Sequence, residues 1–312
     1  RGKGWGGDFR SGDGHRVIFL DDESELIQPR TGKPQPPKPL DGQALSPESV
    51  EDRRIAAASW LTSPTNPYFS RAIVNRVWAN FFTVGLVEKV DDLRLTNPPS
   101  NPELLSALAA LLVSGDRPYD LKKLMRLILT SQSYQRSRQA PKGNEPDERF
   151  YSRYYPKRLK AEVLLDIMSQ VTASPTAFKD FPAGTRAMQL PDANIASDFL
   201  KTFGRPERIL TCECERSDEP SMPQVLHILN GETLIQKLEA KDNRLSKQLE
   251  ANIAPEPLAD ELFLAALSRF PTDRERQKMT EILSVASPEE RRQAVEDLYW
   301  SVLSSKEFLF NR

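Results

Sequence analysis

Apolar residues recur along most of the chain at the three- and four-residue intervals of amphipathic helices. After Asn66-Pro67, for example, Phe69, Ile73, Val77 and Phe81 lie four residues apart. This spacing places the four side chains on one face of a helix. Comparable patterns occupy the segments 102–112, 121–128, 158–172 and 258–270. We therefore predict that helices form most of the structure.

Local signals for helix ends support this prediction. Ser46-Pro47-Glu48 combines an N-cap residue with proline at the first helical position. The segments 272–275 and 287–290 each match the capping box, in which a hydroxyl and a glutamate satisfy each other's backbone amides. No alternation of strands with helices and no repeat of fixed period is present. The predicted fold class is mainly α, an irregular multi-helix domain.

The N-terminal part differs in composition. Six of the fourteen glycines fall in the first fourteen residues, and five prolines lie between Pro29 and Pro39. Glycine disfavours regular structure and clustered prolines make a stiff, extended connector. The short apolar run 17–20 fits a buried strand. We predict a lead-in at 1–45, containing a strand or hairpin, and a helical domain at 46–312.

Composition excludes several classes of protein. The net charge is −1, hydrophobic residues make up 38% and charged residues 28% of the chain. No apolar run is long enough for a membrane span, and a near-neutral balance disfavours nucleic acid as a partner. Only two histidines and two cysteines are present, without a Cys-x-x-Cys-His motif for covalent haem. The sequence predicts no cofactor in this chain.

The segment 204–231 is the first candidate for chemistry. If its middle is extended, Cys212 and Cys214 share one face and Glu215 lies on the other. The structural interpretation, which we favour, buries both thiols in the core, not bonded to each other. The alternative is a metal or redox site in which Cys212, Cys214 and His227 are ligands, although Cys-x-Cys is not the usual zinc spacing.

A second candidate lies on the helix predicted at 158–172. Arg158, Glu162 and Asp166 are four residues apart and form one polar stripe. Two carboxylates one turn apart are a candidate acid–base pair, and Glu162 and Asp166 are therefore candidate catalytic residues together with Glu215 and His227. A solvated ion-pair face is the structural alternative, and we favour it.

A third candidate is the basic segment 121–160, which holds eleven lysines and arginines but only three acids. Tyrosines and a phenylalanine are interleaved with these cations. Cations beside aromatic rings suit an anionic polymer, whereas a solvated, internally neutralised face is the alternative. The candidate ligand-binding residues are Tyr134, Arg136, Arg138, Arg153, Tyr154, Tyr155 and Arg158.

Several longer stretches resemble one protein family. RRIAAASWLTSPTNPYFSRAIVNRVWANFF, YPKRLKAEVLLDIM, RSDEPSMPQVLHILNGETL and LYWSVLSSKEFLFN are similar to successive blocks of domain-of-unknown-function family 1553 of planctomycete bacteria. The resemblance runs from about residue 46 to the C-terminus and implies no established activity, so it transfers no catalytic residues. It implies an exported, envelope-associated polypeptide that also carries a cytochrome c-type domain and a second uncharacterised domain, often found alongside polysaccharide degradation. The start at Arg1 likewise leads us to expect a piece of a longer polypeptide.

Two hypotheses for function follow. The first is a non-catalytic binding or scaffolding module with an anionic glycan as its ligand. The alternative is a hydrolase or redox enzyme with a polar or metal site around Cys212, Cys214, Glu215 and His227. The enzyme hypothesis requires these side chains to converge in one pocket near the helix that begins at Arg158.

Overall fold

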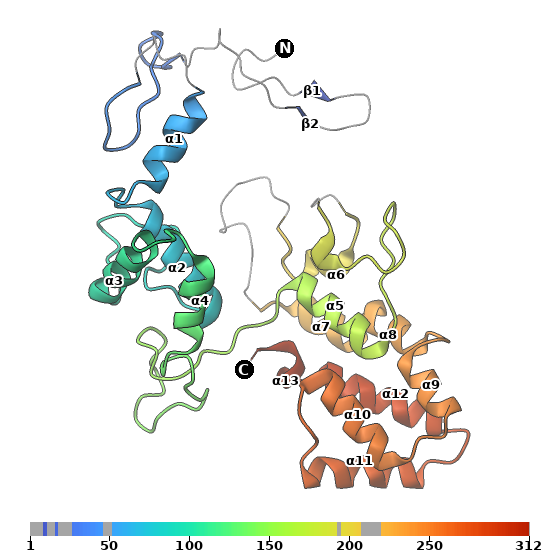
Figure 1. Ribbon diagram of the computed structural model, residues 1–312. Helices are drawn as coiled ribbons and strands as arrows, with labels where there is room; N and C mark the ends of the chain where they lie inside the picture. Colours follow the sequence, from blue (N-terminus) through green and yellow to red (C-terminus); the bar gives the residue numbers. More distant parts are fainter. Residues whose placement is uncertain are drawn as a thin grey trace. The chain divides into compact units, whose positions relative to one another are not determined.

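A computed structural model describes residues 9–10, 16–17, 27–45, 52–191, 195–206 and 220–311. The described chain is mainly α-helical, which confirms the predicted fold class (Figure 1). In the lead-in, the two-residue strands β1 (Phe9–Arg10) and β2 (Arg16–Val17) pair in antiparallel fashion. The boundary expected at 45/46 adjoins residues outside the described ranges and stays a prediction.

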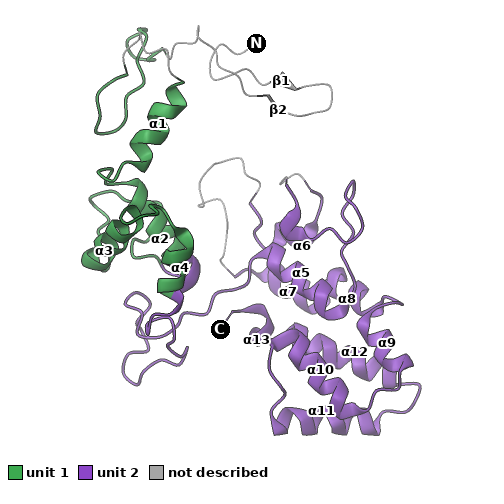
Figure 2. Ribbon diagram, in the orientation of Figure 1, with its two compact units in different colours: residues 1–79, 85–128 green, residues 80–84, 129–312 purple. Residues whose placement is uncertain are grey.

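The chain divides into two compact units (Figure 2). Unit 1 comprises residues 1–79 and 85–128, and unit 2 comprises residues 80–84 and 129–312. The described helices of unit 1 are α1 (Arg53–Thr62), α2 (Phe69–Phe82, whose last three residues belong to unit 2), α3 (Pro102–Val113) and α4 (Leu121–Leu129, whose last residue belongs to unit 2). The described helices of unit 2 are α5 (Ala161–Thr172), the 3-10 helix η1 (Ala187–Gln189), α6 (Asp198–Thr202), α7 (Met222–Asn230), α8 (Glu232–Glu239), α9 (Arg244–Glu250), α10 (Pro255–Leu267), α11 (Asp273–Val285), α12 (Arg291–Leu303) and α13 (Lys306–Leu309).

The predicted face of α2 is only partly buried. Phe69, Ile73, Val77 and Phe81 are all half-buried, and the most buried face lies one residue further along the helix. Its members are Ser70, Val74, Trp78 and Phe82, together with Asn75 and Ala79. The polar Asn75 therefore sits inside unit 1, where its amide must find hydrogen-bond partners.

Helix α5 is the centre of unit 2. It packs against η1, α6, α8, α9 and α10, while α12 packs against α8, α9, α10, α11 and α13. The α5 side chains of Leu164, Leu165, Met168 and Val171 are buried in one apolar core with residues of α10 and α12. Burial of this apolar surface is the main force that holds the helices together.

Helix ends follow the local signals closely. In α11, Thr272 Oγ1 accepts from the Glu275 amide at 3.3 Å, and Glu275 Oε2 accepts from the Thr272 amide at 2.8 Å. The second predicted box also forms, since Ser287 and Glu290 exchange the same two bonds just before α12 begins. The predicted N-cap Ser46 lies outside the described residues. The first described helix, α1, begins at Arg53 and is capped by Asp52.

One arginine ties three parts of unit 2 together. The Arg269 guanidinium donates to both carboxylate oxygens of Glu275 and both of Glu307, at 2.7–3.0 Å. The guanidinium also lies 5.0 Å from the centre of the Phe263 ring. These bonds stabilise the ionised form of Glu275, and the hydrogen bonds from Arg269 lower its pKa to about 2.

This depressed pKa predicts an acid-sensitive contribution to stability. Glu275 stabilises the fold above its ordinary pKa of 4.5, and the contribution is lost as the pH falls from about 4.5 through about 2. We expect urea unfolding to show a steeper loss of stability between pH 5 and pH 2 in the wild type than in Glu275→Gln. The exposed Glu289→Gln variant is the control and should follow the wild type. Equal slopes for wild type and Glu275→Gln would contradict the prediction.

Candidate functional site

The tyrosines of the basic segment form part of a core. Tyr151, Tyr154 and Tyr155 are 9%, 3% and 8% exposed. Edge-on ring contacts join Phe82 to Tyr134 at 5.7 Å and to Tyr151 at 5.2 Å, and Tyr134 to Tyr154 at 5.9 Å. Burial raises the pKa of Tyr154 to about 12. This corrects the sequence interpretation, because Tyr154 and Tyr155 cannot serve as surface platforms for a ligand.

The cations of the same loop lie on its surface. Arg136 and Arg138 are exposed, and Arg136 Nη1 donates to the Tyr151 carbonyl at 2.8 Å. Arg153 Nη1 donates to the Glu145 carbonyl at 3.0 Å, and its guanidinium lies 5.4 Å from the Tyr155 ring centre. These backbone contacts fix both arginines on the tyrosine core without neutralising their charge.

One aromatic ring of the loop does face solvent. The Phe150 side chain is 69% exposed, and the Arg149 guanidinium lies 5.9 Å from its ring centre. Asp147 shapes this turn, since its carboxylate accepts from the backbone amides of Arg149, Phe150 and Ser152 at 2.8–3.0 Å. Sequence reasoning counted Phe150 among the interleaved aromatics but did not single it out from the buried tyrosines.

Only part of the predicted polar stripe forms: Glu162 and Asp166 lie one turn apart on α5, whereas Arg158 precedes the helix, which begins at Ala161. All three side chains contact segments further along the chain. Arg158 Nη2 donates to the Phe203 carbonyl at 3.2 Å, and Arg205 Nε lies 3.7 Å from Glu162 Oε1. Asp166 accepts from the amides of Ala187 and Met188 at 2.6 and 3.2 Å. Arg158 is only 8% exposed, so its proposed place in a surface ligand site is corrected as well. The stripe is not a solvated face, and its two carboxylates do not meet in one site.

His227 of α7 lies beside Phe203, the residue whose carbonyl accepts from Arg158. Its ring packs edge-on against Phe199 and Phe203, with centroids 5.4 and 5.9 Å away, and Nε2 lies 3.0 Å from Thr233 Oγ1. Burial lowers its pKa, opposed by the charges of Asp198 and Glu232. Phe203 thus contacts both Arg158 and His227. Cys212, Cys214 and Glu215 lie outside the described residues, so their convergence with His227 stays a prediction.

Sequence reasoning missed a buried lysine. Lys237 of α8 is 5% exposed, and its ammonium donates to Ser169 Oγ, the Ser174 carbonyl and Thr176 Oγ1 at 2.9, 2.7 and 2.8 Å. Desolvation lowers its pKa to about 8, partly opposed by Asp166. The helical spacing could have indicated its burial, because Lys237 falls three residues after Leu234 on the apolar face of the helix. The three oxygens satisfy all three donors of the ammonium group.

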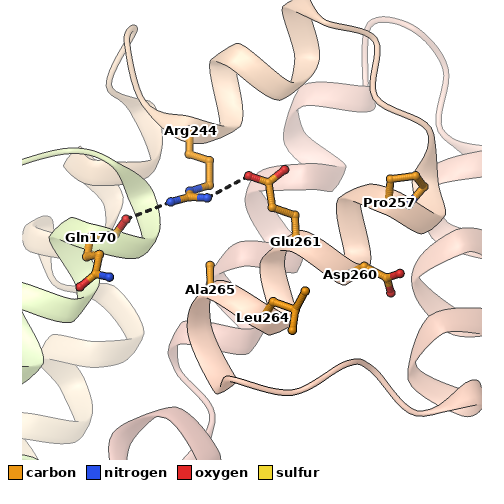
Figure 3. Close-up of a pocket in the computed structure, with 7 residues that line it drawn as sticks. All are labelled: Gln170, Arg244, Pro257, Asp260, Glu261, Leu264 and Ala265. Atoms are coloured by element: carbon orange, nitrogen blue, oxygen red, sulfur yellow. Dashed lines mark hydrogen bonds and ion pairs between the residues drawn. The ribbon is translucent and has the colours of Figure 1, made fainter.

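A pocket lies where α5, α9 and α10 meet (Figure 3). Arg244 bridges its walls, donating to the Gln170 carbonyl at 3.4 Å and to Glu261 Oε1 at 2.8 Å. Asp260 is the neighbour of Glu261 but pairs with Arg276 instead, at 2.5 Å. The lining residues are Gln170, Arg244, Pro257, Asp260, Glu261, Leu264 and Ala265, which include no serine, cysteine, histidine or aromatic side chain.

The described ranges hold neither a metal-binding cluster of side chains nor a membrane-spanning helix. No cluster of three or more histidine, cysteine, aspartate or glutamate side chains is placed there to hold a metal ion. No helix of those ranges has the length and apolar character needed to cross a membrane.

The comparisons with known proteins identify one family. No curated protein and no solved structure matches the chain. The family described as PSD1, protein of unknown function (DUF1553), matches residues 53–283, which is more than two thirds of the chain. On this match, the chain belongs to the DUF1553 family of proteins of unknown function.

Proposed function

We propose that this domain is a non-catalytic binding module whose loop 136–153 binds an anionic polysaccharide. The supporting observation is a set of cations that form no ion pair in the described structure, although Arg153 lies near enough to Glu145 to lower the pKa of that carboxyl. Within the described residues, no carboxylate lies within ion-pairing distance of any of the loop's five basic side chains. These are Arg136, Arg138, Lys142, Arg149 and Arg153.

The loop also has the other parts that such a ligand uses. Phe150 offers an exposed apolar face against which a sugar ring can pack. Arginine guanidinium groups bind carboxylates and sulfates through paired hydrogen bonds. Because Arg136 and Arg153 are held by backbone carbonyls of the loop, less conformational entropy is lost on binding than for free side chains.

Retention on charged polysaccharides tests this proposal. We expect the chain to bind immobilised dextran sulfate and alginate at low salt and to elute as the salt concentration rises. It should not bind neutral dextran. The double variant Arg136→Glu/Arg138→Glu should elute at clearly lower salt, and Phe150→Ser should weaken retention with all charges unchanged. The control is Lys241→Glu/Lys247→Glu, which reverses two exposed cations elsewhere in unit 2.

Two outcomes would overturn the proposal. One is the absence of salt-sensitive retention on either polysaccharide. The other is an equal loss of retention in the loop variant and in the control variant, which would indicate a general charge effect and no site.

The setting of the domain is part of the same proposal. The family resemblance supports an exported, envelope-associated polypeptide in which a cytochrome c-type domain and a second uncharacterised domain are partners within the chain. Polysaccharide is an abundant anionic polymer in that setting. Separate contacts of Glu162 and Asp166 give no support to an acid–base pair in the enzyme alternative.

A further inference from the structure

The hairpin of α11 and α12 carries an apolar groove on its surface. Ile282, Val285, Ala286, Ala294 and Leu298 supply its apolar lining. Val285 is 86% exposed and Ile282 is 49% exposed, although both are large aliphatic side chains. Covering these exposed aliphatic side chains releases free energy in proportion to the apolar area that is buried.

Three carboxylates line the same groove. Glu281, Glu290 and Asp297 accept hydrogen bonds from the Gln277 amide group, the Ser287 backbone amide and the Gln293 amide group, at 2.8, 3.2 and 2.9 Å. In the part of the chain that the structure describes, none of them lies within 4 Å of a basic nitrogen. Their negative charges therefore face solvent without compensation.

The cations of the hairpin do not neutralise these three carboxylates. Arg276 pairs with Asp260, Arg292 pairs with Glu296, and Arg291 donates to the Ile253 carbonyl. The exposed Arg274 and Lys278 form no ion pair in the described structure. The groove thus combines an apolar lining with three carboxylates that form no ion pair among the described residues.

We propose that the groove between α11 and α12 docks a basic amphipathic helix of a partner protein. A groove between two neighbouring helices is the surface onto which a third helix packs. Aliphatic side chains of that helix would cover Ile282 and Val285. Lysine or arginine side chains that flank its apolar stripe would pair with Glu281, Glu290 and Asp297, which supplies charge complementarity and specificity.

This inference is independent of the glycan proposal. The groove is acidic and repels an anionic polysaccharide, whereas the loop 136–153 is basic. A failure of one binding activity therefore says nothing about the other, because the two ligand classes have opposite charge and the two sets of variants do not overlap.

Fluorescence anisotropy with the full chain tests the inference. The probe is a labelled leucine–lysine peptide of about 18 residues, long enough to form an amphipathic helix on contact. A peptide with glutamate in place of every lysine is the matched negative probe. We expect salt-sensitive binding of the lysine peptide only, weakened roughly tenfold or more by Glu281→Gln/Glu290→Gln/Asp297→Asn and also weakened by Val285→Ser.

The control variant removes three exposed acids elsewhere in unit 2, Glu239→Gln/Asp242→Asn/Glu250→Gln, and should bind as the wild type does. Circular dichroism checks that each variant is folded, and the exposure of Val285 makes its substitution harmless to the core. Equal binding of the two peptides, unchanged binding in the groove variants, or an equal loss in the control variant would each overturn the inference.

Discussion

Replacing Asn75 by alanine should destabilise unit 1 by about 3 kcal/mol. The Asn75 side chain is fully buried on α2 and makes three hydrogen bonds to one turn. Nδ2 donates to the carbonyls of Val87 and Val90 at 2.9 and 2.8 Å, and Oδ1 accepts from the Val87 amide at 2.9 Å. Alanine would leave these three backbone groups without partners, two of them buried and the Val90 carbonyl half-buried, at a cost of roughly 1–3 kcal/mol for each buried group before relaxation.

The turn packs closely against the Asn75 side chain. A Cβ atom on Gly85 would lie 2.5 Å from the Val87 carbonyl oxygen and 3.0 Å from Asn75 Oδ1, so glycine is needed for the close approach of the backbone to Asn75. The turn is therefore packed against one specific amide group.

Hydrogen exchange measured by mass spectrometry checks the Asn75 prediction, because it reports on α2 and the 85–90 turn separately from unit 2. The control is Arg76→Ala, one residue away. Arg76 makes an exposed ion pair with Asp91 at 2.7 Å, and its loss should cost at most about 1 kcal/mol. A smaller effect for Asn75→Ala than for Arg76→Ala would show that the turn does not depend on the amide.

Raising the pH from 7 to 10 should stabilise the wild type relative to Lys237→Met by about 2–3 kcal/mol. The sign follows from the lowered pKa of Lys237, about 8 in the fold against 10.5 ordinarily. Between these two values the unfolded chain keeps a proton that the folded chain has released. Folding is then favoured as the pH rises, because the cost of burying the ammonium charge disappears.

Stability curves in urea at pH 7 and pH 10 measure this difference, with Lys241→Met, an exposed neighbour, as the control. Ser169 and Thr176 can still hydrogen-bond to each other in Lys237→Met, since their hydroxyl oxygens are 3.2 Å apart. Only the Ser174 carbonyl then loses its partner, so the variant should fold. A stability gap that stays constant between the two pH values would contradict the prediction.

Helix positions could be predicted from the sequence because their signals are local. Asn101 accepts from the Leu104 amide at 2.9 Å ahead of Pro102, and both capping boxes form where their spacing indicated. The buried face of α2 could not be predicted in the same way. Several adjacent apolar residues there satisfy helical periodicity, and only the partners in three dimensions decide which are covered and why Asn75 lies among them.

In the candidate site, too, local spacing could be predicted from the sequence but the three-dimensional partners could not. Spacing was sufficient to place Glu162 and Asp166 one turn apart on α5, but it did not predict that the helix begins only after Arg158. The partners of all three come from 21 to 45 residues further along the chain. The buried tyrosines show that composition alone does not predict which aromatic rings face solvent. Cations and aromatic rings alternate in the basic segment, yet Phe82, more than fifty residues earlier, turns the rings of Tyr134 and Tyr151 inward.

The polar stripe of α5 has a consequence for how mutants of this family are interpreted. Glu162 and Asp166 hold distant loops in place, so a substitution at either position displaces a segment before it alters any chemistry. A loss of function after either substitution would therefore report the displaced segment as well as any chemistry, and would not by itself identify a catalytic acid pair.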